Sequence, residues 1–214
     1  MPALQLAPLA RQRTISEEIT ERLVLAIASG EQPPGARITE AQIAEAMNVS
    51  RAPAREALLN LAARGVLVPV GARGLHVIPV SDDDAANIRE VRLGLEGIAV
   101  EKVMAASWDV PGLLDPLERI IKDMHGLANG GDMLALAQCD VRFHRTIMEL
   151  SDNPLLLRMW DDFSAQLLIQ FCRDWHRHSD KIGEVELHLR LLDLLRSGDC
   201  TAIQETLRDH FSGE

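Results

Sequence analysis

The chain has 214 residues, of which 47% are hydrophobic and 25% charged, and its formal net charge is −10. This is enough apolar material for one large or two small domains with packed cores, so we expect a soluble globular protein. No apolar run reaches the roughly 18 to 20 residues of a transmembrane helix. The N-terminal MPALQLAPLARQR has its basic residues after the apolar ones, the reverse of a secretory signal. These features predict no membrane association and a cytoplasmic location.

The three cysteines, Cys139, Cys172 and Cys200, are odd in number and lack CxxC spacing. That pattern favours buried free thiols over disulfides or a thiolate metal site. We therefore assign the cysteines a structural role.

The acidic charge is unevenly distributed along the chain. Residues 1–80 carry 8 arginines against 7 glutamates, a net charge of +1, whereas residues 81–214 carry 14 basic and 25 acidic side chains, a net charge of −11. The acidity therefore belongs to the C-terminal part and does not exclude a polyanionic partner for the N-terminal part.

The N-terminal part shows the order of a winged helix-turn-helix. Apolar residues at helical spacing predict helices over residues 15–28, 39–47 and 50–64, ended by glycine or asparagine. Two short β-strands, VLVPV and LHVIPV, follow, joined by the glycine-containing turn GARG. Because helix, helix, tight turn, helix and hairpin is the order of that fold, we predict a winged helix-turn-helix domain over residues 1–80.

The third predicted helix opens with SRAPARE, a basic sequence at a helix start. Ser50 is a candidate N-cap, and Pro53 falls in the first turn, where its missing N–H costs little. Arg51 and Arg55 lie one turn apart at this end, which suits phosphate oxygens and guanine edges in a major groove. The alternative is a solvated helix start with Arg55 paired to Glu56 or another carboxylate, but the surrounding helix-turn-helix favours DNA binding.

Residues 15–80 closely resemble the DNA-binding domain of the GntR family of bacterial transcription regulators, through the stretch PPGARITEAQIAEAMNVSRAPAREALLNLAARGVLVPVGARGLHV. The DNA-contacting residues that this resemblance implies are Ser50, Arg51, Arg55, Arg73 and Gly74. Among them, Ser50 would contact a phosphate and Arg73 would contact DNA from the wing. Ala52 and Ala41 depart from the family pattern, in which Thr and, in some relatives, a DNA-contacting Arg are found. Base preference is therefore not carried over from any one relative.

From residue 81 onward the sequence predicts helices only. SDDD is an N-cap followed by acidic first-turn residues, and breaks fall at WDVPG, NGGD, SDNP, HRHSD and SGD. The helices expected between these breaks cover about 82–105, 111–129, 131–150, 154–177, 182–196 and 200–211. The predicted fold class is mainly α, with an all-α bundle of six to seven helices over residues 81–214 after the winged helix-turn-helix.

Four side chains of this bundle are suited to hold a metal ion. Asp140 and His144 are four residues apart in DVRFH, so they share one helix face. His188 and His210 lie about ten residues before and twelve after Gly198, in helices that the short SGD turn makes antiparallel, so they reach a similar height. One carboxylate and three imidazoles suit a divalent ion such as Zn²⁺, Ni²⁺ or Mn²⁺. Each histidine taken singly is more often structural, but the combined spacing favours a metal site.

Residues 84–211 are similar to the all-helical FCD effector-binding domain of the FadR-like subgroup. The similarity lies in VRLGLEGIAVEKVMA, in DVRFHRTIMELSDNPLL and in the ending between the two last histidines. It implies the same four metal ligands, Asp140, His144, His188 and His210. Leu187 stands where relatives often have Glu, which is expected to alter the surroundings of His188.

The resemblance also implies a small organic acid, a carboxylate or sugar acid, bound beside the metal. An open coordination position and a nearby arginine would hold a carboxylate at two points. Arg92 is the first candidate, with an ion pair to Glu96 one turn on as the alternative. Arg142 is the second, although it lies two residues from both Asp140 and His144 and so tends to point away from the metal face.

These features together predict a bacterial, homodimeric transcription regulator, expected to be a repressor, whose affinity for palindromic operator DNA changes when the acid binds. Two copies are expected because one recognition helix reads only a few base pairs, whereas a dyad-related pair reads a palindrome. The effector would shift a population of domain placements and catalyse nothing. The alternatives are a helical metal-dependent hydrolase and a regulator whose metal is purely structural.

Overall fold

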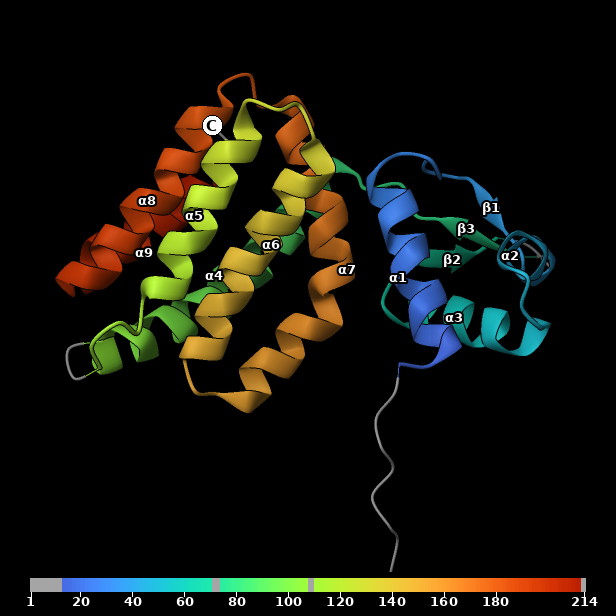
Figure 1. The fold of residues 1–214 in the computed structure, drawn as a ribbon, viewed down its shortest axis with the longest axis horizontal. Coiled ribbons are helices and arrows are strands. Elements are labelled where there is room, and N and C mark those ends of the chain that lie inside the picture. The colour runs from blue at the N-terminus through green and yellow to red at the C-terminus, as the bar shows by residue number, and fades with distance from the viewer. Residues whose placement is uncertain (1–12, 71–73, 108–109, 213–214) are drawn as a thin grey trace, which may run out of the picture.

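Two parts of unequal size make up the computed structural model, which describes residues 13–70, 74–107 and 110–212. In Figure 1, helices and a small sheet form the N-terminal part on the right, and a larger helical bundle lies on the left. The N-terminal part contains α1 (Ile15–Ala28), β1 (Arg37–Ile38), α2 (Glu40–Met47), α3 (Arg51–Ala63), β2 (Leu67–Pro69) and β3 (Leu75–Val77). The bundle contains α4 (Asp82–Ser107), α5 (Asp115–Ala128), α6 (Met133–Leu150), α7 (Pro154–Arg177), α8 (Lys181–Ser197) and α9 (Cys200–Ser212). This arrangement confirms the predicted fold class.

Capping groups mark both ends of α2, and the second of these ends begins the turn to α3. The Thr39 hydroxyl accepts a hydrogen bond from the Gln42 backbone N–H, and the Gln42 side chain accepts one from the Thr39 N–H. Asn48 ends α2 in the left-handed conformation, with φ 51°. Ser50 occupies the N-cap of α3, but its side chain makes no capping hydrogen bond. The turn is therefore as short as the sequence predicts, and the Ser50 hydroxyl stays exposed at the start of α3.

The wing contains one strand that the sequence did not predict. β1 pairs with β3, which also pairs with β2, so the antiparallel order is β1-β3-β2. Ile38 of β1 lies opposite Leu75. A strand of two residues is too short for an alternating pattern to reveal it.

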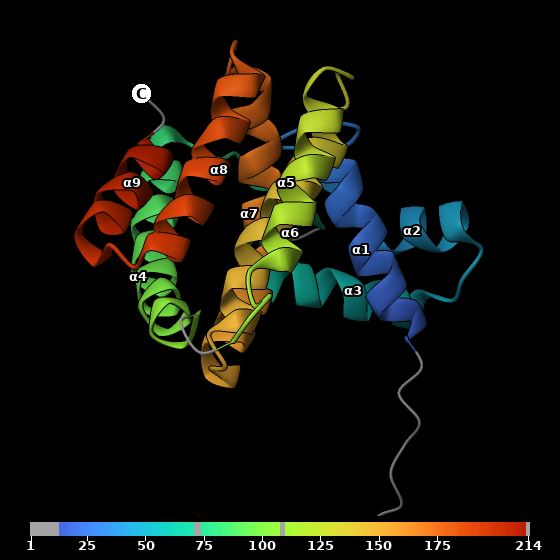
Figure 2. The ribbon, with the colours of Figure 1, turned by 60° about the vertical axis from the view of Figure 1, so that its left-hand side comes forward.

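The bundle surrounds an apolar core. Its largest fully buried side chains include Phe143, Trp160, Leu117, Met124 and Leu136. In Figure 2, α4, α8 and α9 lie together on the side away from the winged helix. α5 begins at Asp115, later than the expected residue 111, because a turn with Gly112 at φ 76° precedes it. Among the described residues, no helix is both long and apolar enough to cross a membrane.

The cysteines that the structure describes are buried. Cys139 and Cys172 are free thiols, as expected, and burial raises the pKa of each. The side chain of Cys200 lies outside the described residues.

The winged helix is held against the bundle along α7, which packs against α1 (Figure 1). The Gln166 side-chain amide donates a 2.7 Å hydrogen bond to the carbonyl oxygen of Arg64, the C-cap of α3. The neighbouring Gly65 has φ 66°, and a Cβ there would approach Gln166 Nε2 to 2.5 Å. About two turns further along α7, Arg173 Nη1 donates to the carbonyl oxygen of Val80 at 2.9 Å. α7 thus contacts both α3 and the segment that joins the two parts.

Candidate metal centre and nucleic-acid interface

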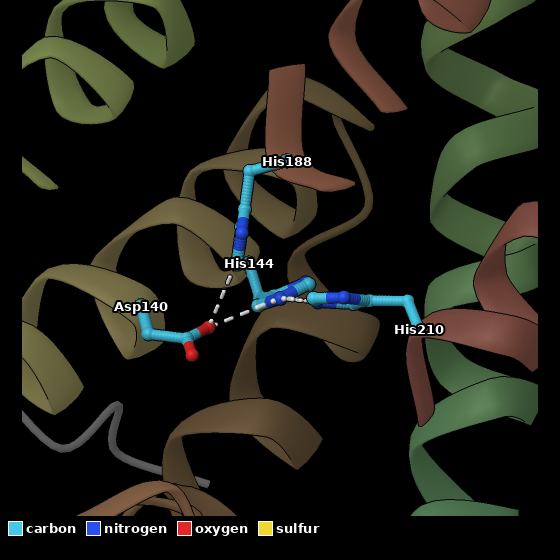
Figure 3. A group of neighbouring side chains, drawn as sticks. All are labelled: Asp140, His144, His188 and His210. Carbon is cyan, nitrogen blue, oxygen red and sulfur yellow. Dashed lines mark hydrogen bonds and ion pairs between the residues drawn. The ribbon is translucent and has the colours of Figure 1, made fainter. Parts of the chain in front are cut away.

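Asp140, His144, His188 and His210, here called the Asp/His cluster, converge inside the bundle. Asp140 and His144 come from α6, His188 from α8 and His210 from α9, and their side chains point toward one another (Figure 3). The Nε2 atoms of His144 and His188 each lie 3.2 Å from Asp140 Oδ1. One ligand atom from each of the four residues lies within 4.8 Å of all the others. The structure thus brings together the four residues that the sequence singled out.

Neighbouring groups fix the orientation of these side chains. His144 Nδ1 lies 2.5 Å from Glu96 Oε2, and His188 Nδ1 lies 2.9 Å from the Glu184 carbonyl oxygen. When each Nδ1 carries the proton for its acceptor, both Nε2 atoms keep a lone pair directed into the cluster. The indole N–H of Trp175 donates to Asp140 Oδ2 at 2.8 Å and leaves Oδ1 for the cluster. This is the outer support that metal ligands have in proteins.

The donor set fits a divalent cation. His210 Nε2 lies 3.2 Å from His144 Nε2, a contact in which two lone pairs repel each other unless a proton or a cation lies between them. One carboxylate oxygen and three imidazole nitrogens are ligands that Zn²⁺, Ni²⁺ and Mn²⁺ accept. His144 and His188 are 0% and 1% exposed, so a bound ion would be shielded from bulk water on their side.

Burial and neighbouring charges shift the pKa values of three residues of the Asp/His cluster. Burial opposes ionisation of Asp140, but His188 and His144 outweigh it and hold the pKa of Asp140 well below its usual value. Burial likewise opposes the charged form of His144, yet Glu96 and Asp140 raise its pKa. Burial, reinforced by the charges of His188 and His144, lowers the pKa of His210 far below its usual value. His210 is therefore a neutral imidazole at neutral pH, with a lone pair available for a cation.

A cavity of about 390 Å³ opens beside the cluster, between the N-terminal half of α4 and the C-terminal end of α7. Asp140, His188 and His210 line it at one place, and three arginines line it elsewhere. These arginines are Arg89, Arg92 and Arg177. A wall that combines a metal-type donor set with guanidinium groups is suited to a small anion.

Arg92 faces the cavity and is also paired. Its Nε donates to Glu96 Oε1 at 3.0 Å, and its guanidinium lies 4.2 Å from the centre of the Phe171 ring. Burial opposes ionisation of Glu96, but the charges of His144 and Arg92 outweigh it, so the pKa of Glu96 is lowered. Glu96 therefore connects the Arg92 guanidinium to the ring of His144.

The sequence did not predict Glu96 or Arg89 as residues of this site. Glu96 was considered only as a partner of Arg92, and its contact with His144, 48 residues away, has no local signal. Arg89 also lines the cavity, and an ion pair for it is not found within the described residues. Its position one turn before Arg92 on α4 is a helical spacing that could have revealed it.

Arg142 does not line this cavity. Its Nη2 lies 2.5 Å from Asp123 Oδ2, and its side chain is 52% exposed. The structure places it on the outer face of α6, as its spacing from Asp140 and His144 suggested.

The start of α3 forms an exposed basic surface on the winged helix. Arg51 and Arg55 are both exposed, and a surface groove lined by both runs to the N-terminus of α2 and to Gly74. Arg55 Nε lies 3.9 Å from Glu40 Oε1, and the Arg55 side chain is 71% exposed. A pair this long and exposed contributes little, so the guanidinium can exchange it for a phosphate or a base.

The wing reaches the same groove through Gly74. Its φ of 86° favours glycine, and a Cβ there would approach Arg37 Nε to 2.8 Å. Arg37 is thus an exposed arginine of β1 that packs on the wing, and no pattern in the sequence singles it out. The predicted wing contact Arg73 lies outside the described residues.

A winged helix-turn-helix, which is a DNA-binding motif, is here joined to an all-helical bundle. Two family models match the chain: "Bacterial regulatory proteins, gntR family" over residues 15–77, and "FCD domain" over residues 87–213. The chain belongs to the gntR family of bacterial regulatory proteins and carries a C-terminal FCD domain. It is a transcription regulator and not an enzyme, which removes the hydrolase alternative.

Relatives of similar length support this assignment. The Nta operon transcriptional regulator of Aminobacter aminovorans is 30% identical, over 83% of this chain and 84% of that protein. The probable D-xylose utilization operon transcriptional repressor of Paenarthrobacter nicotinovorans is 28% identical, over 92% of this chain and 85% of that protein. Among solved structures, E. coli McbR/YncC shares the fold with a TM-score of 0.77 at 23% identity, covering 94% of this chain and 95% of that one.

Proposed function

We propose that this protein is a repressor whose FCD domain holds a divalent metal ion and a small organic acid, and that acid binding changes its affinity for operator DNA. The observation that carries the proposal is the Asp/His cluster, whose four ligand atoms lie within 4.8 Å of one another. Three of its residues, Asp140, His188 and His210, line a cavity that arginines also line. A divalent ion held there would supply an open coordination position for a carboxylate oxygen. Zn²⁺, Ni²⁺ and Mn²⁺ all suit these ligands, so the metal is set by availability and geometry.

The cavity favours a carboxylate or sugar acid as the ligand. Arg92 would hold one oxygen of the acid while its Nε stays on Glu96, because a guanidinium has five N–H donors. Arg89 adds a second guanidinium on the same wall. Arg142 is not part of this proposal, since it pairs with Asp123 away from the cavity.

The N-terminal part would bind DNA through the basic surface of α3. Arg51 and Arg55 would enter the major groove, Ser50 would bind a phosphate, and Gly74 with the predicted contact Arg73 would place the wing against the backbone. A homodimer would present two such helices to a palindromic operator. The protein would act in the cytoplasm, where operator DNA is found in bacteria.

The names of two relatives favour repression. The relative from Paenarthrobacter nicotinovorans is named as a probable repressor of a D-xylose utilization operon, and one from Bacillus subtilis as the gluconate operon repressor. These names also make sugar-derived acids a reasonable first set of ligands.

The proposal is tested with purified full-length protein. Metal content is measured by mass spectrometry, and a DNA duplex is selected by the protein from a random library. We expect about one divalent ion per chain, a selected duplex with dyad symmetry, and a change in duplex affinity of the metal-loaded protein with D-gluconate or D-xylonate. Sedimentation in the presence of the duplex checks that two chains bind one site.

Three results would contradict the proposal. If the protein retains no divalent ion after reconstitution, the proposed metal site is wrong. If the protein selects no duplex, the proposed DNA-binding role is wrong. If a chelator unfolds the bundle while no acid shifts the melting temperature or the duplex affinity, the metal is purely structural.

A further inference from the structure

Asp82 lies where the cavity meets the segment that joins the two parts. It is the first residue of α4, directly after residues 78–81, and it lines the cavity. Its Oδ1 contacts Arg173 Nη2 at 2.5 Å and Arg177 Nη1 at 3.5 Å. Both arginines belong to the last two turns of α7. One carboxylate oxygen is therefore shared by two guanidinium groups.

The two arginines face different structures. Arg173 Nη1 donates to the Val80 carbonyl oxygen at 2.9 Å and lies 3.4 Å from that of Ser81, so it holds the joining segment. Arg177 lines the cavity, as Arg89 does. Asp82 connects the joining segment to the cavity wall through these contacts.

The contact of Asp82 with Arg177 is easily displaced. It spans 3.5 Å between side chains that are 84% and 61% exposed, and ion pairs in such exposed positions contribute little because water screens them. An acid with one group bound at the Asp/His cluster would hold its second anionic group near Arg177 at a high local concentration, as a bivalent ligand does. That second group would compete with the Asp82 carboxylate for Arg177. An anionic group that reaches Arg177 can therefore replace an internal carboxylate there.

We propose that Asp82 is a tethered competitor of the effector: it occupies the Arg177 anion position in the ligand-free protein, and an anionic ligand in the cavity displaces it and loosens the joining segment. This inference rests on the proposed function, because it takes the cavity as the effector site. The released segment lets the winged helix change its placement relative to α7, which alters operator affinity. The coupling is reciprocal: if operator DNA binds better when residues 78–81 are held by Arg173, then bound DNA lowers the affinity of the cavity for the acid.

The test compares Asp82→Asn with Asp83→Asn in the metal-loaded full chain. Both variants remove one negative charge from the exposed first turn of α4, but Asp83 has no hydrogen bond or ion pair to another described residue. Amide hydrogen exchange of residues 78–82 needs neither DNA nor a ligand, and malonate binding by calorimetry uses a small anion as the probe. We expect faster exchange in Asp82→Asn alone.

Malonate affinity should rise at least about five-fold in Asp82→Asn relative to Asp83→Asn, the lower end of typical coupling between sites. The double variant Asp82→Asn with Arg177→Gln should lose that gain, because the freed guanidinium is then absent. Affinity for a duplex selected by the wild type should change in Asp82→Asn and stay at the wild-type value in Asp83→Asn.

If Asp82→Asn and Asp83→Asn show the same amide exchange rates at residues 78–82 and the same malonate affinity, Asp82 is not a competitor of the effector. A faster exchange with unchanged duplex affinity would overturn the coupling to DNA. If the wild type itself selects no duplex, the proposed function fails, whereas the exchange and malonate comparison still decides whether Asp82 is a competitor.

Discussion

The basic start of α3 and the Asp/His cluster of the bundle are built in opposite ways. The Arg55 side chain is 71% exposed, and among the described residues its one ion pair is to Glu40 at 3.9 Å. The His144 side chain is fully buried, with Glu96 and Asp140 on its two ring nitrogens. An exposed group is free to exchange water for a ligand at little cost, whereas a buried group needs its partners in place before any ligand arrives. The surface site is thus made by a few local residues and the buried site by helices from across the bundle.

The same contrast predicts how each site responds to mutation. Removing an exposed arginine affects only the contacts that it makes with a partner, and stability changes little. Removing one member of the buried cluster leaves its neighbours without a counter-charge. Four substitutions test this difference, beginning with the largest expected effect.

His188→Ala is expected to abolish metal retention and to lower the free energy of unfolding by roughly 3 to 5 kcal/mol, because Asp140 then loses a buried partner. Metal analysis and denaturant melts measure the two effects. His125→Ala is the matched control, since this histidine is 36% exposed and its ion pair is with Glu186, which is not a member of the cluster. Full metal content in the His188 variant would contradict the ligand assignment.

Arg55→Ala is expected to weaken binding of the selected duplex by about 1 to 3 kcal/mol and to leave the free energy of unfolding within about 0.5 kcal/mol of wild type. Gel shifts at fixed salt and denaturant melts measure these quantities. Arg22→Ala serves as the control, because Arg22 is also exposed and pairs with Glu18 on α1. Unaltered duplex affinity in the Arg55 variant would remove the DNA-contact assignment.

Glu96→Gln is expected to weaken metal affinity by about 10- to 100-fold, the usual effect of losing a group that orients a metal ligand. The amide keeps the shape of Glu96 but not the charge that faces His144 and Arg92. Competition with a metal-binding dye measures the affinity. Glu90→Gln removes an exposed charge from the same helix, and an equal loss in that variant would show that the effect is only general electrostatics.

Asn48→Ala is expected to lower the free energy of unfolding by about 1 kcal/mol, because alanine tolerates the left-handed conformation at φ 51° poorly. Asn48→Gly should leave the free energy of unfolding nearly unchanged, since glycine adopts that conformation readily. Metal content should be the same in both variants. A loss of metal in either variant would show that a change in the winged helix alters the Asp/His cluster, and would contradict the independence of the two sites.

Local patterns in the sequence were enough to place most helices and the basic surface. The ends of α1, α2 and α3 follow from caps and glycines within a few residues, and the helices of the bundle follow from their breaks. The four cluster residues could be grouped because two share a helix face and two flank one short turn. What the sequence could not show depends on contacts between distant residues. Glu96 reaches His144 across 48 positions, and β1 exists only because β3 pairs with it.

The pairing of Arg55 shows the same limit on a smaller scale. The sequence offered Glu56 or another carboxylate as its partner, and the structure selects Glu40, which lies on the preceding helix. The orientation of Arg92 was likewise open between an effector and Glu96. In the structure it contacts Glu96 and faces the cavity as well, because one guanidinium has donors for both.

The hydrogen bonds from α7 to the N-terminal part end on the backbone. Gln166 binds the carbonyl of Arg64, and Arg173 binds that of Val80. Carbonyl groups are the same whichever side chains surround them, so mutations that change DNA sequence preference on α3 leave this attachment intact. Gly65 is constrained in addition, by its φ of 66° and its proximity to Gln166. The two halves can therefore diverge in evolution at different rates, and a chimaera that keeps Gly65 and the length of the joining segment should still assemble.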